Sequence, residues 1–142
     1  MKKKIKPHMD VYDTMYPLIL VVANEAVSLK EINKYYMWSD GCDVTEKELD
    51  DGCCATTLKL VRRSDMSRVA FVKFNRHEGN LKNKQEETNS FWRLAVHEAG
   101  HVVLMTYHVI QDDIAKDAQY QEPFCYYLDW VSTHIYETIS KK

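Results

Sequence analysis

The stretch His97-Glu98-Ala99-Gly100-His101 lies inside a long apolar run, between residues 91–96 and 102–105. If this run is a helix, residues four apart project from one face, so His97 and His101 can bind one metal ion together. Glu98 follows the first histidine and can approach the position at which a water would bind. Zinc lowers the pKa of such a water, and a carboxylate can then accept its proton. The stretch therefore predicts a helix that carries a zinc site with Glu98 as general base.

The alternative is a half-buried helix face on which two histidines only form hydrogen bonds. An apolar core helix does not ordinarily place two imidazoles and a carboxylate on successive turns without a shared partner, because burying unpaired polar groups is costly. We therefore expect metal binding. His108 lies on the same helix face, but about 10 Å of helix rise separates it from His101, which is too far for it to share the ion.

A third metal ligand is needed, and Glu122 is the leading candidate. It stands at the start of the next predicted helix, with twenty residues between it and His101, so that helix can turn back antiparallel and bring its first turn beside the histidines. The alternative is a first-turn glutamate that only stabilises the helix dipole. The competing ligands are Asp112, Asp113, Asp117 and Cys125.

Two further residues near the motif call for an explanation. Tyr126 could donate its phenol to a polarised carbonyl and is our candidate second catalytic group, although aromatic residues at helical spacing more often belong to the core; Tyr120 and Tyr127 could do the same. Gly100 lies in mid-helix, where it costs about 1 kcal/mol relative to alanine. A close approach of the sheet or a ligand to the helix backbone would explain it.

The composition is that of one ordinary globular domain over residues 1–142. Hydrophobic residues make up 45% and charged residues 28% of the chain. A formal net charge of -2 argues against a specific nucleic-acid binder. No stretch approaches the roughly 18 apolar residues of a membrane span, and the run 18–23 is too short and too far from the basic start for a signal peptide. Residues 1–9 are expected to form a flexible basic tail.

The cysteines are Cys42, Cys53, Cys54 and Cys125, and none stands in a CxxC pair. This spacing argues against a thiolate zinc site. Adjacent Cys53 and Cys54 also make a poor disulfide framework, so we expect reduced thiols in a cytoplasmic setting.

The pattern of the chain predicts a strand, a helix, a hairpin and two long helices. The ranges are a strand at 18–23, a helix at 28–38 with Ser28 as N-cap, a loop with one short turn at 39–52, hairpin strands at 55–63 and 68–75, a mobile loop at 77–89, and helices at 90–110 and 122–139. This order indicates a small α+β domain with a short antiparallel or mixed sheet and helices packed on one face.

Leu94 to His101, followed by Glu122, resembles the gluzincin branch of the zincin metallopeptidases, whose pattern is HExxH on an active-site helix with a glutamate on the next. The resemblance implies that His97, His101 and Glu122 hold Zn²⁺ and that Glu98 is the general base. The expected reaction is hydrolysis of a peptide bond in a protein or peptide substrate by zinc-activated water.

Nearly the whole chain is similar to small zincin-like proteins of tailed phages and prophages of Bacteroides-type bacteria. The similarity is carried by Tyr16-Pro17-Leu18, by the Gly-x-Ala-Thr pattern in residues 52–57, by the histidine motif and by residues 121–130. It implies either a metallopeptidase-like enzyme in the host cytoplasm or a non-enzymatic subunit of the virion. In the second case the zincin fold would serve as a scaffold in the neck or tail, with other phage structural proteins as partners and no membrane association.

The chain departs from full zincin peptidases in its length. Those enzymes have a dedicated edge strand for the substrate and a second lobe that walls the cleft, and 142 residues leave room for neither. The loops after Trp38 and before Ser90 are the remaining material for a substrate site. Metal binding and hydrolysis are therefore separate expectations.

Overall fold

The described residues form one sheet of five strands, and a hydrophobic core packs against each face of this sheet. A computed structural model of the chain describes residues 4–110 and 121–142. In these residues the strands are β1 (Met9–Asp13), β2 (Ile19–Ala23), β3 (Tyr36–Met37), β4 (Ala55–Arg62) and β5 (Arg68–Phe74), in the sheet order β1-β2-β5-β4-β3. Strands β2 and β5 are parallel and the other neighbours are antiparallel. The mixed sheet and its helices confirm the predicted α+β class.

The predicted hairpin is present as β4 and β5. Leu58 pairs with Phe71 and Leu60 with Val69. The connecting turn contains Met66 in the left-handed region, at φ 61°. Asp65 closes the turn by accepting from the backbone amide of Ser67 at 3.0 Å, as aspartate often does in turns.

Strand β5 is buried on both faces, which explains its nearly continuous apolar sequence. Ala70, Val72 and Phe74 face one core, and Val69 and Phe71 face the other.

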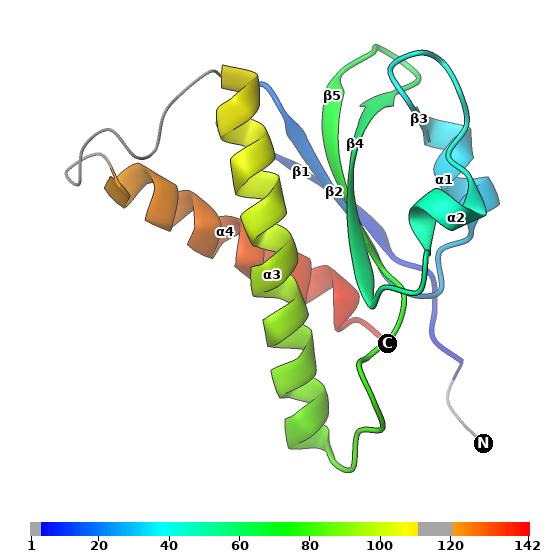
Figure 1. Cartoon of the computed structure of the whole chain (residues 1–142), viewed down its shortest axis with the longest axis vertical. Helices are drawn as coiled ribbons and strands as arrows, with labels where there is room; N and C mark the ends of the chain where they lie inside the picture. The colour runs from blue at the N-terminus through cyan, green and yellow to red at the C-terminus, as the bar shows by residue number, and fades with distance from the viewer. Residues whose placement is uncertain (1–3, 111–120) are drawn as a thin grey trace.

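The two long helices, α3 (Lys84–Ile110) and α4 (Gln121–Ile139), cover the first of these cores together (Figure 1). The expected start of α3 at Ser90 was six residues too late, because its first turns are polar and show no apolar periodicity. Asn83 marks the actual start, since its side chain accepts from the amide of Glu86 at 2.9 Å.

The opposite core is covered by short helices, α1 (Leu29–Tyr35) and α2 (Glu46–Leu49), so the expectation that helices pack on only one face of the sheet is wrong. Ser28 is the N-cap of α1, as predicted, and accepts from the amide of Glu31 at 3.2 Å. Helix α1 ends before the expected Trp38 because Tyr36 and Met37 form β3. The short turn expected within residues 39–52 is α2.

The segment expected to be a flexible tail joins the sheet. Asn24 accepts from the amide of His8 at 3.0 Å and donates to the carbonyl of Lys6 at 2.8 Å. Met9 then begins β1, which pairs with β2. From Lys6 onward the start of the chain is therefore attached to the domain; residues 1–3 lie outside the described part.

A polar network fixes the far end of α4 against β1. The fully buried Thr138 hydroxyl donates to the Asp10 carboxylate at 2.8 Å, and the Tyr12 hydroxyl lies 2.7 Å from the Thr138 hydroxyl oxygen. Lys141 donates to Asp10 at 2.5 Å. Of the helices in the described residues, none combines the length and apolar character needed to cross a membrane.

Candidate metal centre

His97 and His101 lie side by side on the exposed face of α3. Their Nε2 atoms are 3.3 Å apart, and their ring planes meet at 76° with centroids separated by 5.0 Å. Both side chains are exposed. The helical spacing therefore brings the two imidazoles to one point, as the sequence predicted.

This separation fits two ligands of one tetrahedral metal ion. Two nitrogens that bind zinc at about 2.0–2.1 Å with tetrahedral angles lie about 3.3–3.4 Å from one another. The same distance also permits one imidazole to donate a long hydrogen bond to the other.

Glu98 points away from the solvent, into the junction between α3 and β4. Its side chain is buried, with 4% of its surface exposed. One carboxylate oxygen accepts from the hydroxyl of Thr57 on β4 at 2.6 Å. This short charge-assisted hydrogen bond holds the carboxylate in one position beside the histidine pair.

Small residues let α3 approach the sheet at this point. Ala95 and Ala99 are completely buried one turn apart, with Val102 and Val103 following on the same core face. Gly100 does not contribute to this contact, because a methyl group at its Cα would meet no described atom within 4 Å. The expected close approach of the sheet to the Gly100 backbone is therefore wrong.

The third ligand falls at the limit of the described chain. Glu122 belongs to the first turn of α4, but its side chain lies outside the described residues, as do Asp112, Asp113 and Asp117. Cys125 is exposed on α4. Within residues 4–110 and 123–142, no three His, Cys, Asp or Glu side chains converge on a point that could hold a metal. The described part of the site thus supplies two ligands.

A pocket of about 550 Å³ opens beside His97 and Glu98. It lies between the first half of α3 and the start of β4. The lining residues are Gly52, Cys53, Cys54, Ala55, Glu78, Ser90, Arg93, Leu94, His97 and Glu98. The sequence analysis did not indicate Cys53 or Cys54 as neighbours of the motif, because they join it only through the packing of β4 on α3. It also passed over Arg93, although the spacing of four residues before His97 on α3 could have indicated it.

One of the pocket cysteines, Cys53, has an acidic neighbour that disfavours its thiolate form. The Asp51 carboxylate beside Cys53 raises the pKa of that thiol, and the charges of Cys54 and Glu98 act in the same direction. Cys53 is therefore held in its protonated form, which is a poor metal ligand and a poor nucleophile.

Part of β4 presents a free edge near Glu98. Strand β3 pairs with β4 only at Val61 and Arg62, whereas β5 pairs with it from Ala55 to Val61. No described strand pairs with the outer edge of β4 from residue 55 to residue 60. The chain thus has an unpaired strand edge, although its length led us to expect no room for a dedicated substrate-binding edge strand.

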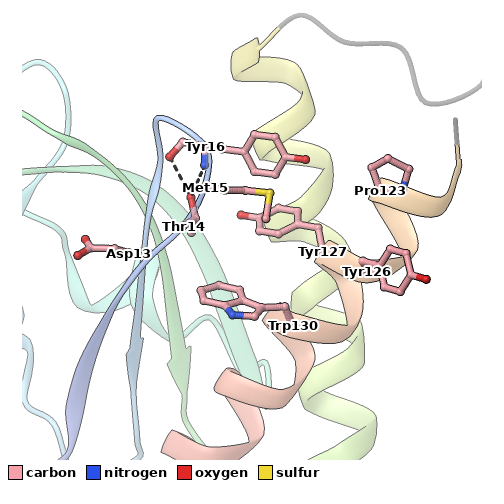
Figure 2. Close-up of a pocket in the computed structure, with 8 residues that line it drawn as sticks. All are labelled: Asp13, Thr14, Met15, Tyr16, Pro123, Tyr126, Tyr127 and Trp130. Carbon is pink, nitrogen blue, oxygen red and sulfur yellow. Dashed lines mark hydrogen bonds between the residues drawn. The ribbon is translucent and has the colours of Figure 1, made fainter.

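Tyr126 lies in a different pocket from Glu98. That pocket, of about 560 Å³, is formed by the turn after β1 and by α4, and none of its residues lines the pocket of His97. Figure 2 shows Tyr126 directed away from the rings of Tyr16 and Tyr127. It is 72% exposed, so the structure does not bring this candidate catalytic group to the histidine motif.

The neighbouring Tyr127 is a core residue. It is buried, and its hydroxyl lies 3.0 Å from that of Thr106 on α3. Burial raises the pKa of its phenol. Tyr120 lies outside the described residues.

Fold and site together define a small α+β domain whose longest helix presents a paired-histidine motif beside a buried glutamate. Comparisons of the chain with protein-family models, with curated proteins and with solved structures found no match.

Proposed function

We propose that this protein is a zinc-dependent peptide hydrolase, with His97, His101 and Glu122 as metal ligands and Glu98 as general base. The observation that carries the proposal is the arrangement of the motif on α3. Two imidazole nitrogens meet at 3.3 Å, and the carboxylate next to them is buried and fixed by Thr57. A purely structural two-histidine site does not require that carboxylate.

Zinc held by these residues would polarise the substrate carbonyl and lower the pKa of a water molecule. Glu98 would take a proton from that water and return it to the leaving amine. One of its oxygens is engaged by Thr57, which leaves the other free for proton transfer. Burial of the carboxylate strengthens its electrostatic interactions, because the surrounding dielectric is low.

A peptide substrate is favoured by the free edge of β4. An extended chain can add to such an edge through main-chain hydrogen bonds. The edge from residue 55 to residue 60 includes Thr57, the partner of Glu98, so a peptide paired there would pass close to the motif.

The proposal is tested by hydrolysis of an unstructured protein such as casein. Zinc-loaded wild type is expected to cleave it, and chelation should abolish cleavage. Glu98→Gln should lose activity by about a hundredfold or more, because general-base catalysis contributes that much, while retaining its metal. His108→Ala is the matched control, since His108 lies on the same helix outside the pocket.

Equal activity in wild type, chelated protein and Glu98→Gln would exclude zinc-dependent hydrolysis. If Glu98→Gln still cleaves the substrate and chelation abolishes that cleavage, the hydrolysis depends on zinc but Glu98 is not its general base.

A second candidate is a non-enzymatic subunit of a phage particle. It is favoured by the exposed apolar side chains beside the histidines, since Val96 and Leu104 are 50% and 57% exposed. Exposed apolar groups of this kind often mark a protein-protein contact. Mass spectrometry of purified particles tests the idea, and absence from the virion together with turnover in solution would rule it out.

A further inference from the structure

Arg93 lies in the pocket of the histidine motif, and no carboxylate among the described residues forms an ion pair with it. It precedes His97 by four residues on α3, so both side chains leave the same face of the helix. Arg93 and His97 line the same pocket, and Arg93 is exposed.

The lack of an ionic partner sets Arg93 apart from most arginines of this chain. Arg62, Arg63 and Arg76 each form an ion pair with an aspartate. No carboxylate of the described residues pairs with Arg93. Arg68 shares this property, but it stands at the start of β5 and does not line the pocket.

We propose that Arg93 binds the C-terminal carboxylate of the substrate, which would make this protein a carboxypeptidase. The inference rests on the proposed function. A guanidinium matches a carboxylate through two parallel hydrogen bonds, which is a specific mode of recognition.

The spacing along the helix supports this assignment. One turn of α3, about 6 Å of rise, separates Arg93 from His97, and a peptide advances about 3.5 Å per residue. With the scissile carbonyl beside the histidines, a carboxylate one or two residues further along falls within reach of the arginine side chain.

The pocket also contains an opposing charge, on Glu78. This residue follows β5 and does not pair with Arg93. A glutamate at this position could instead attract the free amino group of a substrate, in which case the protein would prefer peptides with an unblocked N-terminus. The test therefore uses N-acetylated peptides and includes a free-amine arm.

The first experiment measures binding to the metal-free protein by NMR titration. N-acetyl-Ala-Ala is compared with N-acetyl-Ala-Ala-amide. Wild type is expected to bind the free acid about tenfold more tightly or better, and Arg93→Gln should remove that preference. Arg68→Gln loses the same charge outside the pocket and should keep the preference. Equal binding of acid and amide by the wild type would overturn the inference.

The second experiment measures hydrolysis of the two N-acetylated peptides, and of unacetylated Ala-Ala as the free-amine arm, by the zinc-loaded protein. Cleavage should favour the free acid through a lower KM, and this advantage should vanish in Arg93→Gln. Cleavage that ignores the C-terminal group, or that requires a free N-terminal amine, would refute the carboxypeptidase assignment while leaving the proposed hydrolase intact. Arg93-dependent binding of the acid without hydrolysis of any peptide would refute the hydrolase, and with it the carboxypeptidase, but would leave Arg93 as a site for C-terminal carboxylates.

Discussion

At the scale of single residues, the catalytic proposal depends on the hydrogen bond between Thr57 and Glu98. It joins β4 to α3 across 41 positions of the chain and leaves the carboxylate 4% exposed. Removing the donor would leave a buried carboxylate with an unmade bond. An unsatisfied buried carboxylate destabilises the folded state by more than the hydrogen bond itself stabilises it.

Thr57→Val is therefore expected to lower the free energy of unfolding by about 1–3 kcal/mol. We also expect kcat/KM to fall by about tenfold to a hundredfold, because a group that orients a site residue has effects of this size. Bound metal should remain unchanged. Chemical denaturation, peptide cleavage and metal analysis check the three results. Thr57→Ser keeps the hydroxyl and is the control; unchanged activity in Thr57→Val would contradict the role given to the contact.

The partly buried His77 is expected to make the free energy of unfolding depend on pH. Its ring packs against Phe74 and Phe91, and Nδ1 lies 2.8 Å from the Ser90 hydroxyl. Burial lowers the pKa of His77 below its ordinary value of 6.5. The folded protein thus binds this proton less readily than the unfolded chain, and stability is lost as the pH falls below 6.5.

For the metal-free protein we expect the free energy of unfolding to decrease from pH 7.5 to pH 5.0. His77→Leu should make this decrease smaller, because it removes the titrating group and keeps an apolar contact. Urea denaturation at both pH values measures the difference. An identical decrease in wild type and variant would show that His77 does not titrate differently in the two states.

The histidine pair could be predicted from the sequence because both members lie on one helix at a local spacing. Thr57 and Cys53 could not, since their place in the site depends on how β4 packs against α3. Arg93 could have been predicted from its spacing to His97 on the same helix, but it was passed over. The place of Tyr126 could not be predicted either, because α4 directs its side chain toward another pocket.

At the scale of secondary structure, α3 contains a glycine, Gly100, that the packing of the fold does not require. Gly100 has ordinary helical geometry and open space around it. Gly100→Ala is expected to stabilise the protein by about 1 kcal/mol, because glycine weakens a helix interior by that amount. Thermal denaturation measures the effect, with metal content as the control. A loss of stability would contradict the observed space, whereas higher stability with weaker peptide cleavage would indicate that the substrate needs this position.

The elements with strong apolar patterns were predicted well, and the polar or short ones were not. The hairpin of residues 55–75 could be predicted because apolar side chains alternate along both strands and a polar turn separates them. Strand β1 was missed because its residues are mostly polar or half-exposed and gain their structure by pairing with β2. The two residues of β3 are too few for any periodicity to be recognised.

At the scale of the whole molecule, a metal ion held by α3 and Glu122 would connect the two long helices at the end opposite the Thr138 network. Metal bound only by the folded state stabilises it, by about 4 kcal/mol at a thousandfold excess over Kd. Chelation is therefore expected to lower Tm by about 10 °C.

Scanning calorimetry with and without chelator checks this value. Glu122→Gln should show a smaller loss on chelation than the wild type. An unchanged Tm after complete metal removal would contradict the link between the helices.

The most direct test of the account is the metal content of the purified protein. Mass spectrometry of metals, after dialysis against trace zinc, is expected to find about one equivalent in wild type and in His108→Ala, because one tetrahedral site is proposed. His97→Ala and His101→Ala should each lose it while remaining folded by circular dichroism. Wild type without bound metal, or histidine variants that retain it in full, would contradict the assignment of His97 and His101 as ligands.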